Sequence, residues 1–131
     1  MIDTHCHIDD PQYVEGLDAF LAEQRQDGVE YILVPGVDKT SVKDVLEVCD
    51  RYPDYLFPAL GLHPENVKED WREQLATIKA AVDTRMCSAP LNSLPFREGM
   101  GVGSLLAIGE IGLDYHWDTT FKELQHEALR E

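Results

Sequence analysis

The amino-acid sequence predicts an α/β fold in which four strands form a parallel sheet. Strand-like apolar segments alternate four times with segments that carry an amphipathic helical pattern. Such alternation implies crossover connections, which place successive strands parallel to one another. The chain has 131 residues, of which 44% are hydrophobic and 27% are charged, a composition typical of a domain large enough to bury a core. We therefore expect residues 1–131 to form a single domain.

The first two predicted units each consist of a short strand and an amphipathic helix. Ile2–Cys6 is the first expected strand, and Gly28 is a typical C-terminal stop for the helix that follows it. The second strand, Glu30–Pro35, is nearly all apolar, as in strands that are covered on both faces. Thr40 or Ser41 is the predicted N-cap of the second helix. The apolar stripes of the two helices consist of Val14, Leu17, Phe20 and Leu21, and of Val42, Val45, Leu46 and Cys49.

The third and fourth units repeat this order. Leu56–Leu62 is the third expected strand and ends in His63, and Leu105–Ile111 is the fourth. The fourth helix is predicted to begin at a capping box formed by Thr120 and Glu123. The apolar stripes of the third and fourth helices consist of Trp71, Leu75, Ile78 and Val82, and of Phe121, Leu124 and Ala128.

Residues 83–104 interrupt the alternation as an insertion. They are rich in Pro, Ser and Gly and exceed the usual length of a connection between a helix and a strand. Because this segment leads from a helix into a strand, it is expected at the amino ends of the strands. In barrels that end supports stability, whereas the carboxyl end carries the chemistry. We therefore assign no catalytic role to the insertion.

Two histidines, His5 and His7, end the first predicted strand. Side chains two residues apart on a strand point to the same side, so the pair offers two imidazole donors, as a divalent transition metal requires. Asp3 on the same face can orient a ligand, since metal-bound histidines usually donate their other N–H to a carboxylate or carbonyl. Cys6 faces the opposite side and is expected in the core. Such a pair alone indicates a metal site only weakly.

Glu110 ends the fourth predicted strand on the same face as Leu106 and Ile108. A carboxylate at the end of an apolar face is unfavourable to bury unless a cation meets it. The alternative is a strand-end glutamate that points into water. Gly109 and Gly112 on either side permit close backbone approach and sharp turning, and a carboxylate can bridge a pair of metal ions. We therefore favour a metal ligand.

The four candidate residues, His5, His7, His63 and Glu110, all lie at the carboxyl ends of predicted strands, and they are expected to converge. The formal net charge of −14 argues against a basic nucleic-acid-binding surface, so a polyanionic substrate would need bound cations. No apolar segment approaches the roughly 18 residues of a membrane span, and the N-terminus lacks a basic signal-peptide region. Three scattered cysteines suit a reducing compartment. We expect a cytoplasmic protein without a membrane partner.

Four segments, MIDTHCHID, PGVD, ALGLHPE and IGEIGLDYHWD, resemble the TatD family of metal-dependent deoxyribonucleases, which are amidohydrolase-like (β/α)8 barrels. The resemblance runs from residue 1 to residue 131, interrupted by the insertion. It implies hydrolysis of phosphodiester bonds, usually in DNA, with one or two divalent cations (zinc, magnesium or manganese). It also implies that His5 and His7 are the first two metal ligands, that Glu110 is shared between the metals, and that His63 faces the substrate phosphate.

The chain departs from the family in length. A (β/α)8 barrel needs about 250 residues, so we expect the N-terminal half of a TIM-type barrel, with four parallel βα units. The family's two later histidines and its aspartate, the expected general base, have no counterpart here, so no catalytic residue is assigned. Asp114, Tyr115 and His116 also receive no role, although His116 is interpreted as an exposed loop residue, and His126 is expected on the surface.

Two functions from different classes follow. The first is a TatD-type metal-dependent hydrolase acting on DNA or another phosphodiester. The alternative is a catalytically impaired, truncated remnant with a structural or assembly role only. Strands one and four would lack partners at the open edges of a half-barrel, and the apolar second strand would expose its inner face to water. A homodimer through the open half-barrel is therefore expected; the competing outcome is a monomer in which residues 83–104 cover the open side.

Overall fold

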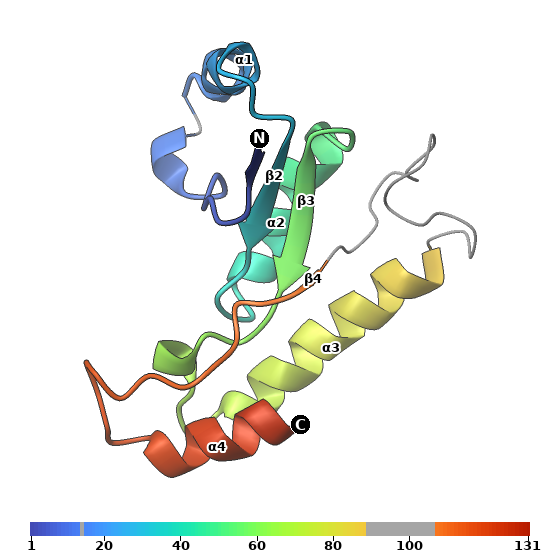
Figure 1. The fold of residues 1–131 in the computed structure, drawn as a ribbon. Helices are drawn as coiled ribbons and strands as arrows, with labels where there is room; N and C mark the ends of the chain where they lie inside the picture. The colour runs from blue at the N-terminus through green and yellow to red at the C-terminus, as the bar shows by residue number, and fades with distance from the viewer. Residues whose placement is uncertain (14, 89–106) are drawn as a thin grey trace.

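The fold of the chain is a four-stranded parallel sheet with helices packed against it (Figure 1). The computed structural model describes residues 1–13, 15–88 and 107–131. The strands lie in the order β1-β2-β3-β4 and are all parallel, as the sequence predicts. They are β1 (Ile2–Asp3), β2 (Tyr31–Pro35), β3 (Leu56–Leu60) and β4 (Ala107–Ile108). The helices are α1 (Leu17–Gln26), α2 (Ser41–Arg51), α3 (Trp71–Ser88) and α4 (Lys122–Arg130).

The two central strands supply most of the buried sheet residues. Ile32 and Val34 of β2 and Leu56 and Leu60 of β3 join one apolar cluster with the inner sides of the helices. The other face is also covered at β3, where all five residues are buried. The expectation that the apolar second strand would expose a face to water is therefore wrong, because every residue of β2 is buried or half-buried.

Three of the strands, β1, β3 and β4, end earlier than the sequence predicts. Of the predicted strand Ile2–Cys6 only two residues pair as a strand, and Leu56–Leu62 ends at Leu60. The fourth strand ends at Ile108, while residues 105 and 106 lie outside the described part. In the first case the Asp3 carboxylate accepts a hydrogen bond from the His5 backbone N–H at 3.0 Å, and such local bonds compete with pairing between strands.

Two predicted helix caps are corrected by the structure. Thr40 lies at the N-cap position of α2, as predicted, but its side chain makes no capping hydrogen bond. Asp38 Oδ1 instead accepts from the backbone N–H groups of Thr40 at 2.8 Å and Ser41 at 2.9 Å. The capping box of Thr120 and Glu123 does not form, and α4 begins at Lys122 without a side-chain cap. The Thr120 N–H instead donates to Asp118 at 2.8 Å. In both places an aspartate two residues earlier forms a tight turn before the predicted cap can act.

The predicted start of the insertion, residue 83, is wrong, because it lies within helix α3. The helix continues to Ser88, so residues 83–88 are helical, and the connection to β4 begins later than predicted. The rest of the predicted insertion, residues 89–104, lies outside the described residues.

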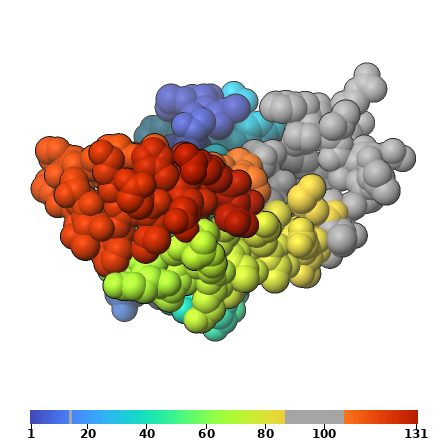
Figure 2. Space-filling view, turned by 90° about the horizontal axis from the view of Figure 1, so that it is seen from below, coloured from blue at the N-terminus to red at the C-terminus, as the bar shows by residue number. Residues whose placement is uncertain are grey.

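Helix α4 packs beside the start of α3, near the carboxyl end of the sheet. Figure 2 shows α4 and the loop before it against the first turns of α3, and Arg72 donates a hydrogen bond to Glu127 at 2.9 Å across this contact. Among the helices in the described ranges, none is both long and apolar enough to cross a membrane.

Candidate metal centre

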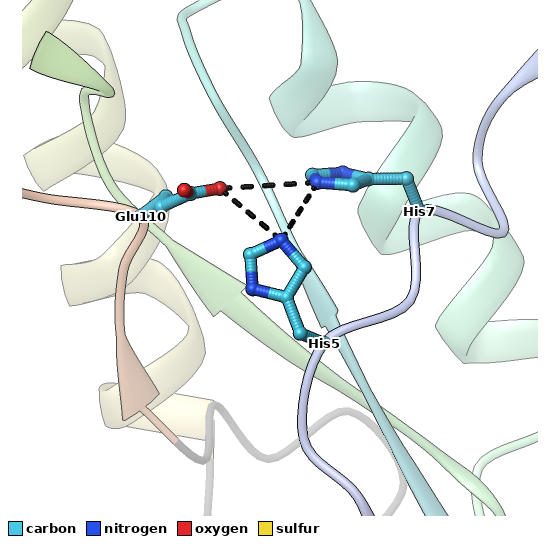
Figure 3. A group of neighbouring side chains, drawn as sticks. All are labelled: His5, His7 and Glu110. Atoms are coloured by element: carbon cyan, nitrogen blue, oxygen red, sulfur yellow. Dashed lines mark hydrogen bonds and ion pairs between the residues drawn. The ribbon is translucent and has the colours of Figure 1, made fainter. Parts of the chain in front are cut away.

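Three side chains from opposite edges of the sheet direct their ligand atoms at one another (Figure 3). The Nε2 atoms of His5 and His7 lie 3.1 Å apart. Glu110 Oε2 lies 3.5 Å from the Nε2 of His5 and 3.8 Å from that of His7. Within the described part of the chain, this is the one group of histidine, cysteine or acidic side chains placed to share an ion.

These distances fit a small divalent cation. Two ligand atoms about 2.1 Å from a tetrahedral ion lie about 3.4 Å apart, close to the three separations in this group. Two imidazole nitrogens and one carboxylate oxygen form the donor set of open zinc sites, in which water takes the fourth position. The side chain of His5 is 54% exposed and that of Glu110 is 29% exposed. Water and a substrate can therefore reach the group.

His5 and His7 are positioned by the segment that follows β1 rather than by the strand itself. Asp3 holds the main chain of His5 and does not contact its ring, so the expected contact with a ligand ring is not present. The Cys6 N–H donates to the Leu33 carbonyl of β2 at 3.1 Å, which keeps this segment attached to the sheet. Cys6 is half-buried and packs against the core, as predicted, and burial raises the pKa of its thiol.

Glu110 is positioned by the carboxyl ends of both central strands. The Gly109 N–H donates to the Leu60 carbonyl of β3 at 3.0 Å, and the Glu110 N–H donates to the Gly36 carbonyl just after β2 at 2.9 Å. Gly61 makes this approach possible, because a Cβ atom there would lie 2.6 Å from the backbone of Gly109 and Glu110. The sequence predicts close approach at Gly109, but a Cβ atom there would meet no neighbour within 4 Å, and the residue that requires glycine is Gly61.

His63 lies directly after β3 and contacts the free side of the Glu110 carboxylate. Its Nε2 is 3.2 Å from Glu110 Oε1. Its Nδ1 accepts a hydrogen bond from the Glu65 N–H at 3.2 Å and so caps the short 3₁₀ helix Pro64–Asn66. All four predicted site residues therefore lie together.

Sequence reasoning missed a buried glutamine that ties this region together. Gln125 of α4 is 3% exposed. Its Oε1 accepts from the Asp114 N–H at 2.9 Å, and its Nε2 donates to the Pro64 carbonyl at 3.1 Å. It therefore joins the segment after Glu110 to the residue after His63. A glutamine on an amphipathic helix is ordinarily a surface residue, so the sequence held no indication of this role.

The remaining histidines lie outside the metal-ligand group. His116 is exposed and contacts the ring of Trp117, with 4.5 Å between ring centroids, as expected for a loop residue. His126 was expected on the surface, but it is half-buried and its Nε2 lies 2.6 Å from the Tyr115 hydroxyl. The correction has the same origin as for Gln125, because α4 packs its polar side against the loop that precedes it.

Comparisons with known proteins support a common fold. A family model described as TatD related DNase matches residues 2–131. The metal-dependent hydrolase YabD of Bacillus subtilis is 32% identical over 130 residues, which cover 99% of this chain and 44% of that protein. A 3'-5' ssDNA/RNA exonuclease TatD of Erwinia tasmaniensis is 25% identical over 129 residues, covering 98% of this chain and 43% of that protein.

A solved structure also matches nearly the whole chain. The crystal structure of YJJV, a TatD homologue from Escherichia coli, matches with a TM-score of 0.78 and 31% sequence identity, over 99% of this chain and 44% of that one. The chain thus spans less than half the length of the relatives it matches. This match and the four parallel strands confirm the predicted N-terminal half of a (β/α)8 barrel.

Proposed function

This chain belongs to the TatD family of DNase-related metal-dependent hydrolases, and we propose that it forms the metal-binding half of an enzyme that cleaves phosphodiester bonds in DNA. The observation that carries the proposal is the convergence of His5 and His7, after β1, with Glu110, after β4, at metal-ligand spacing. Glu110 is 103 residues from His7 in the sequence. Relatives named as a deoxyribonuclease and as an ssDNA/RNA exonuclease support the choice of substrate.

Each side chain has a separate task in this proposal. His5 and His7 bind one cation through Nε2, and Glu110 contributes a negative charge to the same ion; nitrogen donors favour zinc or manganese over magnesium. A cation bound there supplies Lewis acidity and a water of lowered pKa. The family resemblance assigns His63 to the substrate phosphate. Since the chain carries a formal net charge of −14, a bound cation also offsets the repulsion of a polyanionic substrate locally.

Calorimetric titration with Zn²⁺ tests the ligand set. We expect the unaltered chain to bind zinc and a His5→Ala/His7→Ala double variant to lose that binding. His116→Ala is the matched control, because His116 is exposed and, among the interactions that the structure describes, its side chain contacts only Trp117, while its backbone N–H donates to Asp114. Equal zinc binding by the unaltered chain and the double variant would show that His5 and His7 are not the metal ligands.

Cleavage of labelled single-stranded DNA tests the reaction. With Mn²⁺ or Mg²⁺ we expect cleavage far slower than that of a full-length relative, because the later family ligands are not in this chain and catalysis needs water and phosphate held within about 0.5 Å of the productive geometry. If the unaltered chain cleaves DNA as fast as a full-length relative, and Glu110→Ala abolishes this cleavage, then these four βα units suffice for catalysis.

A non-catalytic remnant is the second candidate; the coverage of 44% of YabD fits both a remnant and a piece of a longer hydrolase. The coding sequence after the Glu131 codon distinguishes the two. An in-frame continuation with histidines at predicted strand ends favours the hydrolase, whereas a stop codon favours the remnant.

We also propose that a second copy of the chain closes the open edges. Ile2 of β1 is 51% exposed and Ile108 of β4 is 57% exposed, and among the described residues neither strand has a neighbour on its outer side. A two-fold dimer could pair each β1 edge with the partner's β4 edge and remove both from water. Light scattering at low protein concentration tests this; a single-chain mass with a cooperative melt would contradict it.

A further inference from the structure

We infer that His63 is a positioning residue that orients Glu110 toward the ion bound by His5 and His7. The inference rests on the proposed metal centre. Its starting point is the unequal surroundings of the two Glu110 oxygens. Oε2 faces the two ligand histidines, at 3.5 and 3.8 Å, whereas Oε1 faces only the His63 imidazole, at 3.2 Å.

The hydrogen bonds of His63 determine which of its ring nitrogens carries the proton. The Glu65 N–H donates to Nδ1, so Nδ1 presents a lone pair. In the neutral ring the hydrogen is then on Nε2, the atom next to Glu110 Oε1. His63 therefore donates to Glu110, in the way that second partners orient metal-binding carboxylates.

The backbone fixes this imidazole more firmly than those of the ligand histidines. The His63 N–H donates to the Val37 carbonyl at 2.8 Å, and the Asn66 side chain donates to the same carbonyl at 3.1 Å. The His63 side chain is 22% exposed, against 54% for His5. A firmly held donor can restrict the carboxylate, whose terminal torsion is otherwise broad.

Two substitutions separate orientation from the other roles that His63 could have. His63→Asn keeps an oxygen that can accept from the Glu65 N–H, so the cap and the fold are retained, but its amide is too short to reach Oε1. His63→Gln places an N–H donor at about the position of the imidazole Nε2. We expect calorimetry with Zn²⁺ to give 10- to 100-fold weaker binding in His63→Asn than in the unaltered chain, and recovery to within about threefold in His63→Gln.

The visible absorption of Co²⁺ bound to each variant gives a readout that a general loss of stability would not reproduce. We expect a changed spectrum for His63→Asn and a spectrum like that of the unaltered chain for His63→Gln. Equal zinc affinity in His63→Asn and the unaltered chain would overturn the inference alone, and weaker DNA binding with that equal affinity would assign His63 to substrate instead. No binding by the unaltered chain would overturn the proposed metal centre together with the inference.

Discussion

The central strands β2 and β3 each have five residues and are buried or half-buried throughout, whereas the edge strands β1 and β4 have two residues each and leave Ile2 and Ile108 exposed. The candidate ligands come from the edges: His5 and His7 follow β1, and Glu110 follows β4. Hydrogen bonds nevertheless hold both edge segments to the ends of the central strands. The contrast shows that a site can use exposed, accessible segments for its ligands while the buried strands supply its rigidity.

The sharpest test of this contrast compares two residues that are neighbours in register, Leu60 of β3 and Ile108 of β4. Leu60 is fully buried, so Leu60→Ala is expected to lower the free energy of unfolding by about 2–5 kcal/mol. Ile108→Ala removes a similar side chain from an exposed edge and is expected to cost less than about 1 kcal/mol. Urea denaturation measures both, and equal losses would show that β4 is as firmly packed as β3.

Gly61 lies where the end of β3 contacts the backbone of Gly109 and Glu110. Its substitution tests whether the packing of the central strands affects metal binding by the edge segments. A Cβ atom in Gly61→Ala would meet the Gly109–Glu110 backbone at 2.6 Å, so we expect a loss of about 1–3 kcal/mol in unfolding free energy and weaker Zn²⁺ binding.

Gly36→Ala is the control for this substitution, since its nearest neighbour would be the Ser41 hydroxyl at 3.3 Å. If Gly61→Ala changes neither the stability nor the zinc affinity, the position of Glu110 does not depend on its close contact with the residue after β3.

Gln125 tests whether α4 contributes to the order of the edge segment after β4. Gln125→Ala leaves the Asp114 N–H and the Pro64 carbonyl without their partner, which we expect to lower the free energy of unfolding by about 1–2 kcal/mol. Glu123→Ala on the exposed side of the same helix is expected to change it by less than about 0.5 kcal/mol. Chemical denaturation of both proteins checks this. A similar small change in each would show that the hydrogen bonds of Gln125 do not stabilise the segment after β4.

The smallest expected effect lies on the outer helices, in the Asp50–Arg85 pair between α2 and α3. Arg85 donates to both Asp50 oxygens at 2.7 Å and so holds the pKa of that carboxyl below its ordinary value. The folded state therefore binds this proton less readily than the unfolded state, and the stabilisation is present at neutral pH and lost as the solution is acidified through the carboxyl range.

Because Asp50 is partly exposed, Asp50→Asn is expected to cost less than about 1 kcal/mol at pH 7. The difference from the unaltered chain should disappear in acid, where thermal melts of the two proteins should converge. A difference that stays constant across this range would mean that the ion pair is not its source.

The sequence by itself predicted the parallel sheet and the candidate site residues, because both depend on local patterns. The apolar run Glu30–Pro35 predicts a central strand whatever surrounds it, and His5, His7, His63 and Glu110 each follow a predicted strand whose carboxyl end faces the same way in a parallel sheet. The four side chains are therefore expected at the same end of the sheet.

Only the tertiary structure decided where the strands end and which groups hold the ligands in place. Gly61 and Glu110 are 49 residues apart, and the need for glycine arises from a backbone that approaches from the next strand. Gln125 is buried only because α4 packs against Pro64. His63 directs its Nε2 at Glu110, since the backbone N–H of Glu65 donates to its other ring nitrogen, Nδ1. Each of these contacts depends on the distance between segments that are remote in the chain, and hydropathy patterns carry no information about such distances.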